Sequence, residues 1–350
     1  MATDLSRPGP AHDAHLTAGP PTLPAGWFAL AHLGELRRRA VLPRTLAGRE
    51  VVVFCTAAGR VAALPAHCPH LGAHLGHGGR VEGEALVCPF HGLRFDVDGR
   101  CVGTGYGSAA PAGLRAGGVE VRVVDDAVVA WWDPESRGPS FEIPAPPPRR
   151  AGPWRWARRR LTGHPQETTE NSVDIGHLRV LHGYRSVEQT APLELDGPHL
   201  TVAYRARRPA RLGGFGRRDL EIEFGIDVWG LGWSRVEVRV PRYGLAFRQL
   251  VLATARQPGE IDLLLGVAVA DGGGPGEATT GRRLVAPLLA SAAVRGAIGA
   301  GILGAVVYDV AQDARIWAHK VHVARPPLVP GDGPLIDYRR WARQFYADPT

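Results

Sequence analysis

The chain has 350 residues, a formal net charge of +7 and four cysteines. This length is enough for two domains with sizeable cores, and four cysteines are too few for a disulfide-held secreted scaffold. The first 25 residues are rich in Pro, His, Ala and Gly and lack the apolar segment of a secretory signal. We therefore expect a disordered tail over 1–25 and a protein of the reducing bacterial cytoplasm.

Residues 26–140 are expected to form an all-β domain. Short apolar runs alternate with glycine-containing turns, a pattern typical of small β-sandwiches. The pair Asp98-Gly99 favours a tight hairpin turn. The runs that predict strands are 51–54, 61–64, 85–87, 119–124 and 127–132.

Two Cys-His pairs in this domain predict its chemistry. Cys68-Pro-His70 and Cys88-Pro-Phe-His91 each offer one thiolate and one imidazole, and a glycine lies just beyond each histidine. This is the ligand set of a Rieske [2Fe–2S] cluster, in which two cysteines hold one iron and two histidines hold the other. A tetrahedral zinc site is the alternative, but zinc fingers group Cys with Cys and His with His along the chain.

The proline-rich segment 141–153 is predicted to be a stiff linker. Nearly all the positive charge is arginine, and it gathers in runs at 37–39, 149–150 and 158–160. We interpret these runs as a solvated face, with a docking patch for an acidic electron donor as the alternative. No aromatic-basic motif supports nucleic-acid binding, so we expect no nucleic-acid partner.

The second domain is expected over 154–350. Polar and apolar residues alternate over 220–228, which indicates an antiparallel sheet with one wet face. Helices are expected near 168–182 and 282–320. The expected fold class is α+β, in which the all-β domain precedes a curved antiparallel sheet around a long C-terminal helix. The predicted strands of this sheet are 200–206, 220–229, 234–240, 246–254 and 261–270.

A second metal site is predicted in this domain. His177 and His182 lie near one face of a slightly loosened helix, and Asp174 lies on the same face. Two histidines and one distant carboxylate form the facial triad of mononuclear non-haem Fe(II), which leaves positions open for O₂. The carboxylate is expected to be Asp313, because apolar residues just behind it would anchor it inward. Asp309 is the reserve candidate.

The segment 284–308 is apolar and about as long as a bilayer span. Pro287, Arg295 and four glycines interrupt it. We expect a buried helix pair or the wall of a hydrophobic channel, with peripheral membrane association as the less favoured alternative.

The two Cys-His loops and the Asp-x-x-His-x₄-His motif resemble the oxygenase component of the Rieske non-haem iron oxygenases. The segments 166–171, 316–320 and 332–346 are similar to the steroid branch of that family, which includes cholesterol 7-desaturases of the Neverland type and the oxygenase of 3-ketosteroid 9α-hydroxylase. The resemblance covers roughly 26–346. It implies two cofactors, a [2Fe–2S] cluster and a mononuclear Fe(II), with the ligands Cys68, His70, Cys88, His91, His177, His182 and Asp313.

The resemblance also implies an activity. A sterol or similar lipophilic polycyclic substrate would be desaturated or hydroxylated with O₂, using electrons from NAD(P)H through a separate reductase or ferredoxin. Asp174 would be a catalytic bridge between a cluster histidine, such as His91, and His177. In relatives this bridge crosses between subunits, so a homotrimer is implied. The alternatives are an aromatic or secondary-metabolite substrate, a ferredoxin-like electron carrier, and a zinc-stabilised binding protein.

Overall fold

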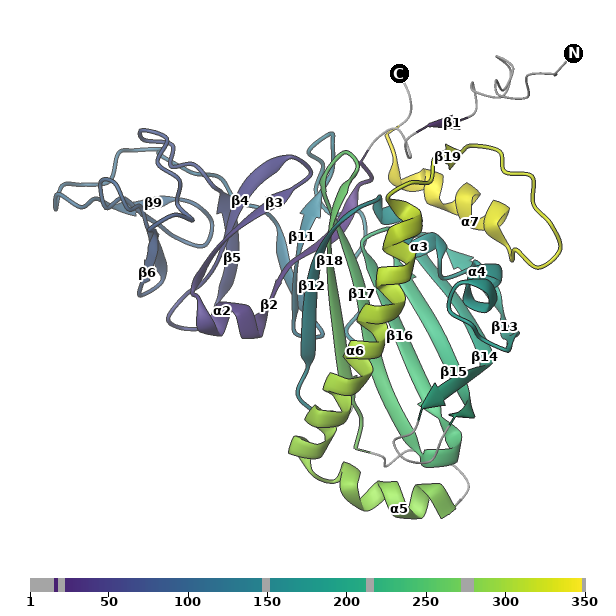
Figure 1. Ribbon diagram of the computed structural model, residues 1–350. Coiled ribbons are helices and arrows are strands. Elements are labelled where there is room, and N and C mark those ends of the chain that lie inside the picture. The colour runs from purple at the N-terminus through teal and green to yellow at the C-terminus, as the bar shows by residue number, and fades with distance from the viewer. Residues whose placement is uncertain (1–15, 18–22, 147–151, 212–216, 272–279, 348–350) are drawn as a thin grey trace, which may run out of the picture.

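The computed structural model describes residues 16–17, 23–146, 152–211, 217–271 and 280–347. These residues form two lobes, one made by 26–132 and the other by 155–345 (Figure 1). Most of the expected tail over 1–25, and part of the expected linker over 141–153, lie outside the described residues.

The N-terminal lobe consists of three small antiparallel sheets, as the predicted all-β domain requires. Each predicted strand is present to within two residues. A short helix, α2 (Leu33–Arg38), follows the first strand. The strands of the first sheet, in the order in which they pair, are β3 (Val41–Leu46), β4 (Arg49–Cys55) and β5 (Val61–Pro65). Those of the second are β10 (Val121–Val124), β11 (Ala127–Trp132) and β2 (Gly26–His32). Those of the third are β6 (Arg80–Glu82), β7 (Ala85–Val87), β8 (Arg94–Phe95) and β9 (Cys101–Gly103).

The strand β4 shows how the sequence builds this lobe. Its apolar run is buried on both faces, because successive side chains of a strand point to opposite sides. Val51 and Val53 enter one core, whereas Val52 and Phe54 enter a second core that also contains Cys68. One face of β4 therefore packs in the same core as the cysteines of the cluster loops.

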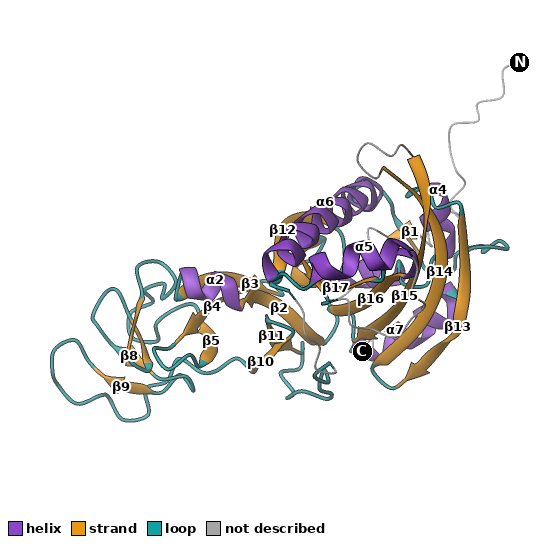
Figure 2. Ribbon diagram, turned by 90° about the horizontal axis from the view of Figure 1, so that it is seen from below, coloured by secondary structure: helices purple, strands orange, loops and turns teal. Residues whose placement is uncertain are grey.

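The C-terminal lobe is a seven-stranded antiparallel sheet with one long helix, α6 (Ala292–Trp317), against one face (Figure 2). This confirms the predicted fold class. The helix packs through Leu303 and Val310 on Leu263 and Leu265 of the sheet. The strand order is β12 (Arg155–Thr162), β18 (Glu260–Val269), β17 (Leu245–Gln257), β16 (Trp233–Val240), β15 (Arg217–Trp229), β14 (His199–Arg211) and β13 (Ser186–Asp196).

Smaller elements complete the lobe. They are the turn η2 (Pro241–Tyr243), the helix α5 (Thr280–Leu289), the pair β1 (Leu16–Thr17) and β19 (His322–Val323), the helix α7 (Leu335–Ala342) and the turn η3 (Arg343–Phe345).

Each of the two predicted helical segments is divided in two. For the first segment this corrects the sequence prediction, whereas for the second it agrees with the helix pair expected over 284–308. The segment expected at 168–182 forms α3 (Pro165–Glu170) and α4 (Ile175–Val180). Asp174 lies between them and is the N-cap of α4, where its backbone is extended, so no continuous helix passes through it. Likewise, 282–320 divides into α5 and α6, and Ser291 caps the second helix with its side chain. His182 consequently lies in the loop after α4.

The arginine run 158–160 is part of the edge strand β12, which the sequence prediction missed. Its side chains alternate in direction. Arg158 turns inward and donates hydrogen bonds to the Leu30 carbonyl at 2.9 Å and to Glu35 at 3.1 Å, whereas Arg159 is exposed. The interpretation of this run as one solvated face or docking patch is wrong for Arg158, which joins the two lobes.

The two lobes share a buried apolar contact. Trp27 and Val129 of the first lobe pack with Trp233 and Leu250 of the second. The Thr254 hydroxyl also donates to the Ala29 carbonyl at 2.7 Å. The position of one lobe relative to the other is therefore determined by this packing.

Candidate metal centres

The two Cys-His loops have the same backbone geometry. In the first loop, the N–H of Gly72 donates to the Cys68 carbonyl at 2.9 Å, and in the second, the N–H of Gly92 donates to the Cys88 carbonyl at 3.1 Å. The φ angles of Gly72 and Gly92 are +75° and +66°, in the left-handed region that favours glycine. The glycines beyond each histidine thus permit the tight loops that the sequence predicts.

The four donor groups of these loops divide into a buried sulfur pair and an outer nitrogen pair. Cys68 and Cys88 are 3% and 2% exposed, whereas His70 is exposed and its ring centroid lies 4.9 Å from that of His91. Burial raises the pKa of the Cys68 thiol to about 11, and a hydrogen bond with Cys88 acts in the same direction. Such thiols need a nearby cation to become thiolates, and the irons of a [2Fe–2S] cluster would supply that charge.

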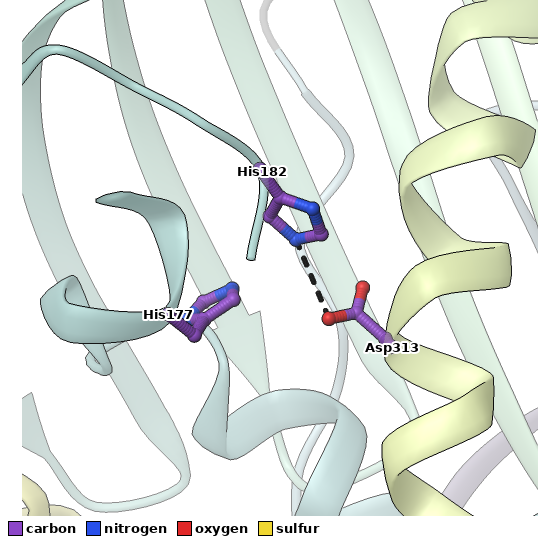
Figure 3. Close-up of side chains that lie close together, drawn as sticks. All are labelled: His177, His182 and Asp313. Carbon is purple, nitrogen blue, oxygen red and sulfur yellow. Dashed lines mark ion pairs between the residues drawn. The ribbon is translucent and has the colours of Figure 1, made fainter. Parts of the chain in front are cut away.

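The second predicted site brings His177, His182 and Asp313 together (Figure 3). One ligand atom from each lies within 4.8 Å of the others. Nε2 of His182 is 3.3 Å from Oδ1 of Asp313. The residues come from α4, from the loop after it and from α6, so the site joins three parts of the lobe. Two imidazoles and one carboxylate match the donor set of mononuclear non-haem iron.

The outer nitrogen of each imidazole is already occupied. Nδ1 of His177 lies 2.6 Å from the Asp174 carbonyl, to which it donates, and Nδ1 of His182 lies 2.9 Å from Oε1 of Gln312. Both rings therefore present Nε2 to the site, as metal-binding histidines do when a polar partner orients them. Sequence reasoning missed the role of Gln312. Its only signal was its position directly before Asp313.

The electrostatics of His182 also suit a cation. Burial alone would lower its pKa, but hydrogen bonds to Asp313 and Gln312 outweigh this effect and the pKa is raised. Both ring nitrogens face oxygen atoms, Nδ1 that of Gln312 and Nε2 that of Asp313. A divalent cation would bind through Nε2, which faces Asp313.

Asp309 lies outside this group of donors, although it lines the same pocket. Its two carboxylate oxygens each accept a hydrogen bond at 2.6 Å from the guanidinium of Arg208. Of the two candidates on α6, only Asp313 is grouped with the histidines.

Asp174 has two roles in the structure. Its Oδ1 accepts a hydrogen bond from the His177 backbone N–H at 3.1 Å, which caps α4, and its carbonyl orients the His177 ring. Burial raises the pKa of its carboxyl, but hydrogen bonding to His177 outweighs this and the pKa is lowered. The side chain remains 31% exposed, so it is accessible from outside the chain.

The donors His177, His182 and Asp313 open onto a pocket between α6 and the sheet. Ala305 and Val306 line it, so the segment 284–308 contributes a pocket wall as predicted. Among the described residues, α6 is the one helix that has the length and apolar composition of a membrane span. The apolar lining consists mainly of Ile222, Phe224, Ile226, Val236, Val238, Val251, Ile302, Ala305 and Val306.

The two donor sets lie far apart within one chain. The sheet of β6, β7, β8 and β9, which holds the second cluster loop between β7 and β8, is at one end of the molecule, and α4 is at the other (Figure 1). Among the described residues, the cluster loops therefore do not approach α4 of the same chain. Leu71 and Phe90, next to the cluster histidines, are 64% and 63% exposed.

A Rieske lobe joined to a sheet lobe with a 2-His-carboxylate pocket defines the class of Rieske oxygenases. A model of the Rieske [2Fe–2S] domain matches residues 26–112, and a model of the 3-ketosteroid 9α-hydroxylase C-terminal domain matches residues 130–346. The chain belongs to this family of Rieske oxygenases, and its cofactors are a [2Fe–2S] cluster and a mononuclear iron. The predicted family, enzyme class and cofactors are thereby confirmed.

Sequence relatives lie within the same branch. Cholesterol 7-desaturase nvd of Bombyx mori is 30% identical, over 94% of this chain and 71% of the relative. The oxygenase component of 3-ketosteroid-9-alpha-monooxygenase from Mycolicibacterium smegmatis is 28% identical, over 92% of this chain and 82% of the relative.

Solved structures show the same fold. Dicamba monooxygenase bound to dicamba has a TM-score of 0.60 at 19% identity and covers 91% of this chain and 96% of its own. NdmB of Pseudomonas putida has a TM-score of 0.63 at 15% identity, over 91% of this chain and 89% of its own.

Proposed function

We propose that this chain is the oxygenase component of a system that hydroxylates or desaturates a neutral polycyclic lipid of the sterol or 3-ketosteroid type. The observation that carries this proposal is the meeting of His177, His182 and Asp313 at the wall of an apolar pocket. The named activities of the desaturase and monooxygenase relatives support the substrate class. An apolar pocket with few polar groups suits such a molecule.

The proposed ligands follow from the donor geometry. His177, His182 and Asp313 would hold the mononuclear iron, and the cluster would bind Cys68, His70, Cys88 and His91. When bound, the mononuclear iron activates O₂ and the cluster supplies electrons one at a time.

The chain's own residues prepare the site. Asp174 and Gln312 hold the two imidazole rings with Nε2 inward. The buried carboxylate of Asp313 balances the charge of a cation. The apolar wall excludes water and holds the hydrocarbon next to the ligands.

Electron transfer is proposed to occur between subunits. One chain separates its own two sites, while the exposed Leu71 and Phe90 and the partly exposed side chain of Asp174 are accessible to a second copy. In the proposed homotrimer, the cluster tip of one subunit docks at α4 of the next, and Asp174 accepts a hydrogen bond from His91 of the neighbouring copy. Electrons would reach the cluster from a separate reductase or ferredoxin.

The location is proposed to be the cytoplasm. All four cysteines are free thiols in the structure, and ligation of an iron–sulfur cluster requires reduced thiols.

The proposal is tested by reconstitution. Anaerobically purified protein, supplied with a generic reductase, NADH and O₂, should convert a member of a sterol and ketosteroid panel, with the product identified by mass spectrometry. The variant His177→Ala should keep the visible spectrum of the cluster and lose the product. Product formation by His177→Ala, or purified protein that contains zinc without iron and sulfide, would contradict the proposal.

A further inference from the structure

A bidentate ion pair crosses the pocket beside the mononuclear site. Nη1 and Nη2 of Arg208, on β14, donate to the two carboxylate oxygens of Asp309, on α6. Asp309 precedes Asp313 by four residues, which is about 6 Å along a helix axis. Both members of the pair line the same pocket as the proposed iron ligands.

The guanidinium of Arg208 is held in place on a second side. Its central carbon lies 5.3 Å from the centroid of the Tyr184 ring, and Tyr184 follows His182 by two residues. An arginine has five N–H donors. Asp309 takes two of them, and the Tyr184 hydroxyl can take one, so at least two have no partner among the residues that the structure describes.

The pocket wall around this pair is apolar. Ile222, Phe224, Val238, Ile302 and Val306 contact the same space, so the hydrocarbon part of a ligand would lie against them. An oxygen on such a ligand loses its hydrogen bonds to water and needs a donor in the pocket. Ser234 and Gln249, from β16 and β17, are the other polar side chains on the sheet side of the pocket.

We infer that Arg208, held by Asp309 and Tyr184, recognises an uncharged oxygen of the substrate, a hydroxyl or a ketone, close to the carbon that is oxidised. This inference rests on the proposed function, because it assumes that a polycyclic lipid occupies the pocket. Arg208 is then a specificity-determining residue that orients the ring system relative to the iron ligands.

The charges of Arg208 and Asp309 indicate which oxygen-containing groups of a substrate the pocket can bind. Asp309 already neutralises the guanidinium, and Asp313 lies one helical turn away. A substrate carboxylate at this pair would find the positive charge of Arg208 already neutralised by Asp309 and would gain no net ionic attraction from it. A neutral hydroxyl or ketone only needs a donor, which the remaining N–H groups supply. The site should therefore favour oxygenated neutral rings over both hydrocarbons and acids.

The inference is tested by equilibrium binding to the purified holoprotein under anaerobic conditions. The ligands are a 3-keto steroid, a 3-hydroxysterol, the same skeleton without the oxygen, and a steroid carboxylic acid. Wild-type protein should bind the oxygenated neutral ligands about tenfold more tightly than the hydrocarbon, the usual worth of one charge-assisted hydrogen bond. In Arg208→Gln this ratio should fall to about one, and in Asp309→Asn the acid should bind about tenfold more tightly than to wild type.

Control variants separate recognition from folding. Arg205 lies on the same strand as Arg208 and forms an exposed ion pair with Glu223 of β15. The variant Arg205→Gln breaks this pair and should keep the wild-type binding ratio. If Arg208→Gln is unstable, the double variant Arg208→Gln with Asp309→Asn removes both charges at nearly constant volume and should also lose the ratio. An unchanged ratio in these Arg208 variants, or its loss in Gln249→Leu instead, would overturn the inference.

The outcome for the proposed function is read separately. Wild-type protein that shows the binding ratio but forms no oxidised product with a reductase would contradict the proposed function and support the inference. Wild-type protein that binds none of the neutral ligands would overturn both.

Discussion

Oε1 of Gln312 lies 2.9 Å from Nδ1 of His182, on the side of the ring opposite Asp313. Two adjacent residues of α6 thus contact the two nitrogens of one imidazole. The first orients the ring and the second provides the carboxylate of the proposed iron site. A rotation of α6 about its axis would therefore move both the carboxylate of Asp313 and the partner that orients His182.

Loss of the Gln312 side chain should weaken the mononuclear site and leave the cluster intact. In Gln312→Leu the His182 ring loses its orienting partner, and removal of such partners typically costs about 10- to 100-fold in metal affinity. Fe(II) titration of protein stripped of its mononuclear iron measures this, with the cluster absorbance as an internal reference. Gln312→Glu retains an oxygen acceptor and should recover most of the affinity. Equal affinity in Gln312→Leu and wild type would contradict the role.

The ion pair between Arg339 and Glu170 should stabilise the part of the chain that leads to the iron site. Arg339, on α7, donates to both oxygens of Glu170, on α3, at 2.7 and 2.9 Å, and the two side chains are only 14% and 10% exposed. In Arg339→Leu a buried carboxylate loses its partner, which costs about 3–5 kcal/mol. The melting temperature should fall on the order of 10 °C.

A matched control is available on the same helix. Arg340 pairs with Asp337, but these side chains are 72% and 56% exposed. Exposed pairs contribute little, so Arg340→Leu should leave the melting temperature nearly unchanged. If both variants lost the same amount of stability, the importance of the buried pair would be refuted.

The sequence pointed to His177 and His182 as metal donors because their spacing is short and local. His177 and His182 are close along the chain, and the Cys and His residues of each cluster loop can be recognised directly in the sequence. The choice between Asp309 and Asp313 was harder, since both lie on one helical face. The structure separates them by the position of Arg208, which is set by the pairing of β14 with β15. Such long-range register has no local signature.

The same limit explains the errors in the fold. A helix was expected to continue through Asp174, but capping of α4 competes with continuation and prevails there. The run 158–160 was interpreted by its charge alone. The inward position of Arg158 depends on Glu35, which lies 123 residues away, so the pattern of the run could not reveal it.

Acid should destabilise the interface between the lobes through His32. This side chain is 8% exposed and stacks on Trp156 with ring centroids 5.0 Å apart. Burial lowers its pKa from 6.5 to about 4, and nearby arginines including Arg158 act in the same direction, while Glu35 opposes them. The unfolded chain therefore binds more protons between about pH 4 and 6.5, so stability falls as the pH falls through this window.

This contribution is measured by comparing melting temperatures at pH 7.5 and pH 5. The loss attributable to His32 should be up to about 2 kcal/mol. His32→Phe keeps an aromatic ring against Trp156 but cannot be protonated, so it should lose less stability in acid than wild type. His319→Gln, at an exposed position, should behave like wild type. An identical acid loss in His32→Phe and wild type would exclude His32 as the cause.

The two loop glycines should respond unequally to alanine, although both have a positive φ. An added Cβ at Gly92 would lie 2.7 Å from the Cα of Gly105, whereas at Gly72 it would meet no atom within 4 Å. In Gly72→Ala the only cost is the strain of a left-handed backbone, about 1 kcal/mol of folding stability, so this variant should retain the cluster. Gly92→Ala must also move one backbone segment away from another, which displaces the loop of Cys88 and His91. Iron and sulfide analysis with the visible spectrum should show substantial cluster loss in Gly92→Ala alone. Equal retention in both variants would mean that the contact with Gly105 does not set the loop geometry.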